Sequence, residues 1–66
     1  MKVKFPDITV ELSDQVGNAF AIMGRVRKAM RRGGCTNAEI ESFTKECTEG
    51  NYDHLLQTVM FTVETS

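Results

Sequence analysis

The feature that most constrains the fold is an amphipathic segment between Asn18 and a pair of glycines, Gly33 and Gly34. Over residues 19–32, apolar side chains recur at helical spacing on one side, and basic side chains cover the other. The Asn18 side chain can accept hydrogen bonds from the free amides that begin a helix, and glycine readily takes the left-handed conformation that ends one. The sequence therefore predicts a helix over residues 19–32 whose apolar stripe must be covered by other elements.

Two strands are predicted, one on each side of the helical part of the chain. Residues 8–12 alternate apolar and polar side chains and include β-branched residues, as a half-buried strand does. Pro6 cannot donate to a sheet ladder, so a sheet edge or a bend is expected there. The tail over residues 61–65 alternates in the same way and is predicted to lie beside the first strand, with a continued helix as the alternative.

Two more helices are predicted between these strands. Thr36 and Glu39 have the spacing of a capping box and open a helix over residues 37–48. Asn51 can cap a third helix over residues 52–60, in which apolar side chains again recur at helical spacing. The element order β-α-α-α-β predicts a small single α+β domain in which a short two-stranded sheet packs on a helical bundle.

The composition places the chain among small globular proteins and away from several functional classes. With 66 residues, 41% hydrophobic and 26% charged, it is one ordinary domain. A net charge of −1 argues against a dedicated DNA-coating protein, and no apolar run approaches the roughly 20 residues of a membrane span. Cys35 and Cys47 would lie about 18 Å apart on a helix, too far for a disulfide. Reduced thiols and a cytoplasmic location are therefore expected.

Small size and unprotected sheet edges both favour a homo-oligomer. A chain this short buries only about 60% of the surface of its unfolded form, and a two-stranded sheet leaves edges that can pair with another chain. On the long helix, Phe20 and Gly24 continue the line of Arg27 and Arg31. This line is expected to be covered by the chain's own C-terminal segment, by a second copy or by an anionic ligand. The predicted oligomer interface comprises Phe20, Ala21, Gly24, Phe61 and Val63.

The basic side of the long helix is the strongest candidate for a functional surface. Arginine pairs with phosphate or carboxylate through two parallel hydrogen bonds, so a nucleotide or an acidic protein fits this surface. The simpler alternative is a solvated face near the negative end of the helix dipole. His54 is a further candidate for a polar ligand contact or, more simply, a member of a local hydrogen-bond network. The predicted ligand- or partner-binding residues are Arg27, Lys28, Arg31, Arg32, Phe20 and His54.

The sequence offers little support for catalysis or for a bound metal. Asp53 and His54 are adjacent, and adjacent residues of a helix do not face each other. Cys35, Cys47 and His54 do not have the spacing of a zinc site. We therefore expect a non-enzymatic protein with no cofactor and no metal. The methionines after the first are expected to fill gaps in the core: Met23, Met30 and Met60.

Two stretches, GNAFAIMGRVRKAMRRGG and NYDHLLQTVMFTVE, resemble a group of small uncharacterised proteins of bacteria, phages and mobile elements. Members of that group share a basic helix that begins with GNAF and a YDHLL helix that precedes a short β tail. The resemblance covers about residues 17–64 and implies the same helix and tail, together with a phage or prophage origin. It implies no particular activity.

The favoured hypothesis is a small oligomeric binding protein, associated with a phage or mobile element. Its basic helix face would bind a nucleotide or an acidic host protein and thereby counter a host defence. Reversing the charges of Arg27 and Arg31 is expected to abolish binding and to leave the fold intact. Nucleic-acid binding by the same helix is a second hypothesis, with the steep salt dependence of counterion release. A structural or accessory subunit without a ligand is the third.

Overall fold

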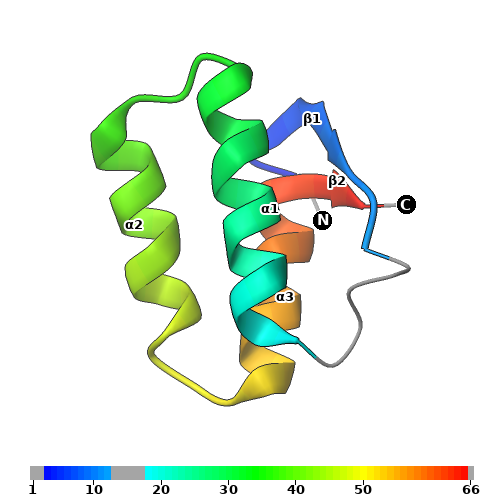
Figure 1. Ribbon diagram of the computed structural model, residues 1–66, viewed down its shortest axis with the longest axis vertical. Coiled ribbons are helices and arrows are strands. Elements are labelled where there is room, and N and C mark those ends of the chain that lie inside the picture. The colour runs from blue at the N-terminus through cyan, green and yellow to red at the C-terminus, as the bar shows by residue number, and fades with distance from the viewer. Residues whose placement is uncertain (1–2, 13–17, 66) are drawn as a thin grey trace.

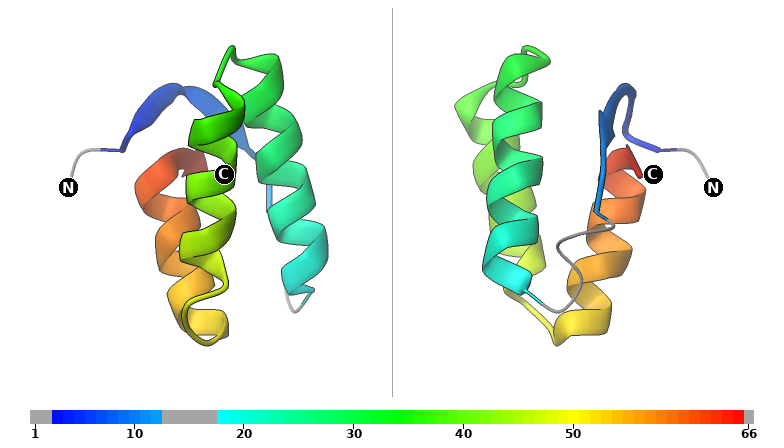
Figure 2. Two further views of the ribbon diagram at one scale, coloured as in Figure 1. Left: turned by 90° about the vertical axis from the view of Figure 1, so that its left-hand side faces the viewer. Right: turned by 45° about the vertical axis from the view of Figure 1, so that its right-hand side comes forward.

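The computed structural model describes residues 3–12 and 18–65, in which the chain forms three helices and two strands. Figures 1 and 2 show α1 and α3 between α2 on one side and the sheet on the other. The predicted α+β class, the element order and the packing of a two-stranded sheet on helices are confirmed. In chain order the elements are β1 (Phe5–Val10), α1 (Ala19–Arg32), α2 (Asn37–Cys47), α3 (Tyr52–Thr62) and β2 (Val63–Thr65).

Each helix begins where a side chain satisfies its first free amides. The Asn18 carboxamide oxygen accepts a hydrogen bond from an amide of the first turn of α1 at 3.0 Å, and Asn51 does the same for the His54 amide of α3. At α2 the capping box is complete. The Glu39 amide donates to Thr36 Oγ1 at 3.1 Å, and the Thr36 amide donates to a Glu39 carboxylate oxygen at 2.7 Å. The predicted starts of all three helices are confirmed.

The core lies where the three helices meet the sheet. α1 contributes Ile22, Val26 and Met30, each fully buried. Because this apolar stripe fixes the rotation of α1 about its own axis, the basic residues of α1 are turned to solvent. The other core side chains come from the remaining four elements: Ile8, Val10, Ile40, Phe43, Cys47, Leu55, Val59 and Val63.

The two strands pair in parallel, and their ladder is irregular. Phe5 lies opposite Val63, and Thr9 lies opposite Glu64, the very next residue of β2. The residues between Phe5 and Thr9 therefore bulge out of the ladder, and Pro6 is one of them. A proline inside such a bulge removes no ladder hydrogen bond. A sheet edge or a bend was expected at Pro6, and the irregular register of the ladder includes this residue.

Both predicted strand ranges differ from the structure. The first strand runs from Phe5 to Val10, so the predicted range of residues 8–12 starts and ends too late. The strand begins at Phe5 because this residue still pairs with Val63 on the far side of the bulge. The predicted terminal strand over residues 61–65 starts too early, because α3 continues through its first two residues and β2 begins only at Val63.

α3 runs past its predicted end at residue 60, as far as Thr62. Thr62 Oγ1 donates a hydrogen bond to the Thr58 carbonyl, and Thr58 Oγ1 donates to the His54 carbonyl. These are the bonds that a threonine makes one turn back in a helix. Thr62 also shares the buried side of α3 with Leu55 and Val59.

The predicted end of the second helix, at residue 48, is one position late because Thr48 is the cap that follows α2.

Two side chains lie where the sequence did not place them. Val63 was predicted at an oligomer interface, and its side chain is 0% exposed within the single chain and belongs to the core. Met60 is 58% exposed, so the expectation that it fills the core is wrong. Met60 follows the buried Val59 by one residue, and successive residues of a helix point about 100° apart. Met30, in contrast, is fully buried as expected, and Met23 packs against the core.

Candidate functional site

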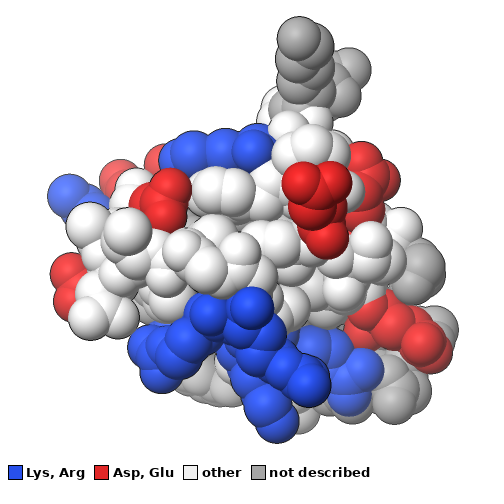
Figure 3. All heavy atoms as spheres, turned by 90° about the horizontal axis from the view of Figure 1, so that it is seen from above, with Lys and Arg blue, Asp and Glu red and all other residues white. Residues whose placement is uncertain are grey.

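The basic side chains of α1 are gathered on one part of the surface. Figure 3 shows the largest group of lysine and arginine along the lower border of the molecule, with smaller basic groups elsewhere and acidic side chains at several places around it. The helix dipole stabilises cations in the last turn of a helix by about 0.3–1 kcal/mol each. All the basic side chains of α1 are exposed: Arg25, Arg27, Lys28, Arg31 and Arg32. Within residues 3–12 and 18–65, four of them form no ion pair: Arg27, Lys28, Arg31 and Arg32.

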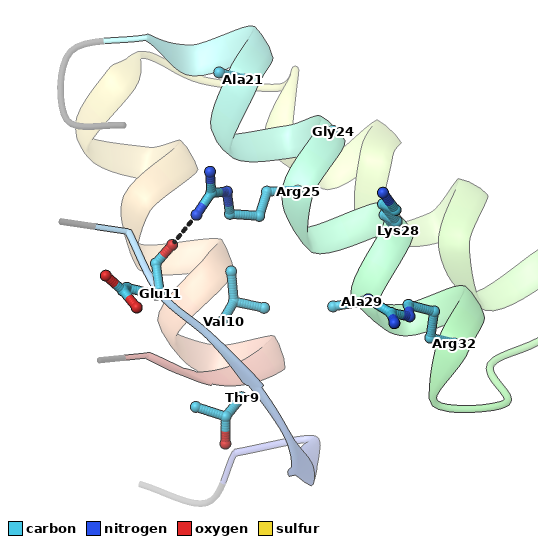
Figure 4. Close-up of a pocket in the computed structure, with 9 residues that line it drawn as sticks. All are labelled: Thr9, Val10, Glu11, Ala21, Gly24, Arg25, Lys28, Ala29 and Arg32. Carbon is cyan, nitrogen blue, oxygen red and sulfur yellow. Dashed lines mark hydrogen bonds between the residues drawn. The ribbon is translucent and has the colours of Figure 1, made fainter. Parts of the chain in front are cut away.

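An open groove of about 520 Å³ lies between α1 and β1. Thr9, Val10 and Glu11 line it from the β1 side. From α1 come small residues, Ala21, Gly24 and Ala29, which leave the space open. Figure 4 shows three cations along the same side of the helix. We call these three the groove cations: Arg25, Lys28 and Arg32.

The groove continues along β1 as far as Asp7. A second cavity of about 320 Å³ shares Thr9, Ala29 and Arg32 with the first and extends to Asp7 and Gly33. At that end α1 and β1 lie in close contact, because a Cβ atom on Gly33 would lie only 2.7 Å from Ile8 Cδ1. Glycine at this position therefore sets how closely the strand approaches the helix.

Arg25 is the groove cation that the sequence-based site did not include. Its Nη1 donates a hydrogen bond to the Glu11 carbonyl oxygen at 3.1 Å, across one end of the groove (Figure 4). This bond ties α1 to the chain just after β1. Arg25, Lys28 and Arg32 follow one another at three and four residues, the spacing of neighbours on a helix surface. That spacing is the signal in the sequence that identifies the three as one set.

The predicted line of Phe20, Gly24, Arg27 and Arg31 lies beside the groove. We call Phe20, Arg27 and Arg31 the outer face of α1; none of the three lines the groove. Phe20 is 84% exposed, and a Cβ atom on Gly24 would meet no described atom within 4 Å. The expectation that the chain's own C-terminal segment covers this line is therefore wrong. Gly24 and Ala21, predicted for an oligomer interface, line the groove instead.

His54 does not line the groove and joins α3 to α2. Its Nε2 lies 2.9 Å from the carbonyl oxygen and 3.0 Å from the carboxylate Oε2 of Glu46. Both oxygens accept hydrogen bonds, so Nε2 is the donor. A Cβ atom on Gly50 would lie 2.7 Å from the ring carbon Cγ of His54, so glycine leaves room for the ring. The predicted local hydrogen-bond network of His54 is confirmed. Phe61 and His54 both line a separate cavity of about 340 Å³.

The two cysteines are held in their protonated form. Burial raises the pKa of the Cys47 thiol to about 11, and the carboxylate of Glu46 adds to this rise. Burial and then Glu39 raise the pKa of the Cys35 thiol, against an opposing effect of Lys4. Because the thiolate is the reactive form, neither cysteine is activated at neutral pH. Among the described side chains, no three that could ligate a metal gather together.

Comparison with known proteins yields no significant match to a protein-family model, a curated protein or a solved structure. Of the helices in the described part of the chain, none is both long and apolar enough to cross a membrane. The function of the groove is therefore inferred from the residues that line it.

Proposed function

We propose that the protein is a non-enzymatic binding protein that holds an anionic partner in the groove between α1 and β1. The observation that supports this most is the convergence of Arg25, Lys28 and Arg32 on one open groove. Guanidinium and ammonium groups form charge-assisted hydrogen bonds with phosphate and carboxylate, each worth about 1.5–3 kcal/mol. A volume of about 520 Å³ lies in the range of sites that bind small molecules, a nucleotide among them.

The charges around the groove favour an anion. Glu11 and, in the second cavity, Asp7 are the acidic residues that line it, and Figure 4 shows the Glu11 carboxylate pointing away from α1. Lys28 and Arg32 form no ion pair with any described carboxylate, so an incoming anion does not have to displace an internal partner from them. An anionic ligand would therefore gain two charge-assisted contacts without breaking existing ones.

Nucleic-acid binding is the second candidate, and the outer face favours it. Phe20 is an exposed aromatic side chain beside two arginines, and such a side chain can stack on a base. The net charge of −1 weighs against this candidate. DNA binding would weaken steeply as salt is added, because neutralised phosphates release counterions. A mobility-shift titration at low and high salt tests it, and no shift at low salt would contradict it.

We further propose a homo-oligomer, a phage or mobile-element origin and a cytoplasmic location. The exposed Phe20 supports contact between copies. The resemblance of the α1 and α3 sequences to small phage proteins supports the origin. In that setting, the anionic partner is a nucleotide signal or an acidic protein of a host defence. Native mass spectrometry of the purified protein would report the oligomer mass and any bound nucleotide together, and a bare monomer would contradict the oligomer.

Two matched double variants test the groove itself. Lys28→Glu with Arg32→Glu reverses two groove cations, and Arg27→Glu with Arg31→Glu reverses two outer-face cations at the same four-residue spacing. The probes are ATP and a glutamate-rich peptide, measured by isothermal titration calorimetry. We expect the outer-face variant to bind like the natural protein, and the groove variant to bind about 100-fold more weakly or worse, because two charge-assisted contacts are lost.

The opposite results have clear meanings. If only the outer-face variant loses binding, the site is the line of Arg27 and Arg31 that the sequence predicted, and the groove is not used. If the natural protein binds neither probe, the proposed function is contradicted. Circular dichroism of both variants verifies that the helices remain folded.

A further inference from the structure

We infer that the anionic partner is an extended acidic peptide, which joins the sheet as a third strand on the open edge of β1. This inference rests on the proposed function, because it names the partner of the same groove. Within the part of the chain that the structure describes, β1 pairs with β2 alone. The other edge of β1 therefore presents backbone groups that lack a sheet partner, and such edges bind extended peptides.

The open edge of β1 faces the groove. Because Arg25 of α1 donates to the Glu11 carbonyl, that carbonyl points toward the helix and away from β2. The backbone groups of successive residues in a strand alternate between its two edges. The N–H and C=O of Thr9, two residues before Glu11, are therefore expected to point toward the groove as well. Thr9 lines both parts of the groove, so a bound peptide would meet a donor and an acceptor there.

The groove has the shape that a strand requires. It follows β1 from Asp7 to Glu11 and has α1 along its other side (Figure 4). Ile8, Val10, Ala21 and Ala29 are apolar residues that line it, and the small side chains of the two alanines leave room for a peptide backbone. A small phosphate compound would use the cations alone, whereas an extended peptide uses the cations, the strand edge and the length of the groove.

The groove cations match the side-chain spacing of an extended peptide. An α-helix rises about 1.5 Å per residue, so Lys28 and Arg32 lie about 6 Å apart along the helix axis. Alternate side chains of a strand lie on one face about 6.6 Å apart. Two carboxylates at alternate positions of a bound strand can therefore meet Lys28 and Arg32 together. The partner is thus expected to carry an acidic side chain at every second position.

The charge pattern of the peptide is the first thing to test. The probe is a fluorescein-labelled peptide that alternates glutamate with threonine, and its fluorescence anisotropy is followed as the full chain is added. The matched control has the same composition with its glutamates next to one another. We expect the alternating peptide to bind about tenfold more tightly or better, the equivalent of one charge-assisted contact. Equal affinity for the two peptides would overturn the inference.

The strand edge is tested separately from the charges. Thr9→Pro removes the N–H that faces the groove, and proline is tolerated where that N–H has no sheet partner. We expect this variant to bind the alternating peptide about tenfold more weakly, since the peptide loses a backbone hydrogen bond to the strand edge. Unchanged peptide binding in a folded Thr9→Pro protein would overturn the inference.

A change in the peptide gives the same test without altering the protein. Two versions of the alternating peptide are methylated on backbone nitrogens, one at odd and one at even positions. Because a strand presents only alternate N–H groups to its neighbour, we expect one version to keep its affinity and the other to lose it. Equal affinity of the two versions would overturn the inference even if Thr9→Pro fails to fold.

The results also separate this inference from the proposed function. If ATP binds and Lys28→Glu with Arg32→Glu abolishes its binding, while no peptide binds, the proposed function stands and the inference falls. If neither probe binds, both fall. If sedimentation shows a dimer that Thr9→Pro dissociates and no peptide binds, a second copy of the chain occupies the edge, and the inference falls.

Discussion

The two basic faces of α1 carry the same chemistry and differ in what lies beside them. Arg27 and Arg31 of the outer face precede Lys28 and Arg32 of the groove by one residue each, and all four are exposed. Only Lys28 and Arg32 line the groove, because β1 packs on their side of the helix. A pattern of charges on one helix shows which cations reach solvent. The neighbouring strand decides which of them converge on a common space.

The largest effect is expected from a change that loosens β1 on α1. Ile8 is 8% exposed and packs against α1 at Gly33. Ile8→Ala is expected to lower the free energy of unfolding by about 2–4 kcal/mol, through lost burial and the cavity left behind. It is also expected to weaken ATP binding in the groove, because the groove loses one wall. Urea unfolding measures the first effect, and calorimetry measures the second.

The neighbouring residue provides the control for this change. The Thr9 side chain is exposed, so Thr9→Ala is expected to change the free energy of unfolding by less than about 0.5 kcal/mol. Equal destabilisation by Ile8→Ala and Thr9→Ala would contradict the packing of β1 on α1. The difference between the groove cations and the outer face would then have no structural explanation, because it depends on that packing.

A smaller effect on the free energy of unfolding is expected from the ionisation of Cys47, a buried residue of the core. The Cys47 thiol keeps its proton in the folded protein up to a pKa of about 11, whereas its ordinary value is 9.0. Between these values the unfolded chain releases the proton first. Stability that is complete below pH 9 is therefore lost as the pH rises toward 11, by about 1.4 kcal/mol per pH unit.

Cys47→Ala is expected to remove this part of the pH dependence. The measurement is urea unfolding of both proteins at a series of pH values on either side of 9. The difference between their unfolding free energies is expected to shrink as the pH rises, because only the natural protein has the thiol to ionise. A difference that stays constant from neutral pH to pH 11 would contradict the burial of Cys47 and the raised pKa that follows from it.

The smallest effect is expected at Gly24, which lies between the two faces. Gly24→Ala is expected to raise the free energy of unfolding by about 0.5–1 kcal/mol, because alanine suits a helix interior better than glycine. No described atom lies within 4 Å of the added carbon. Thermal unfolding measures the change. A loss of stability would show that something covers Gly24 in solution, and a second copy seated on the Phe20 side of α1 is the first such cover to test.

The helices were predictable because their ends depend on neighbouring residues. Asn18 at α1 and the capping box at α2 are local signals, and each cap forms as expected. The terminal strand was less predictable, because Phe61 and Thr62 fit both an alternating strand and a continued helix. The burial of Thr62 on the same side of α3 as Leu55 and Val59 favours the helix.

The basic character of the candidate site was predictable from the sequence, but the particular residues that line the groove were less so. The exposure and the charge of Lys28 and Arg32 follow from the amphipathic pattern. The inclusion of Arg25 and the absence of Arg31 follow from the position of β1, which Ile8 fixes by a contact with distant Gly33. No local pattern encodes a contact between segments so far apart in the chain.

Amide chemical shifts during a titration test the use of the groove most directly. Isotope-labelled protein is titrated with ATP and with the alternating glutamate peptide while backbone and arginine side-chain N–H signals are followed. Use of the groove predicts that the changes concentrate at Thr9, Arg25, Lys28 and Arg32. Changes confined to Phe20, Arg27 and Arg31 would contradict the groove and place the site on the outer face.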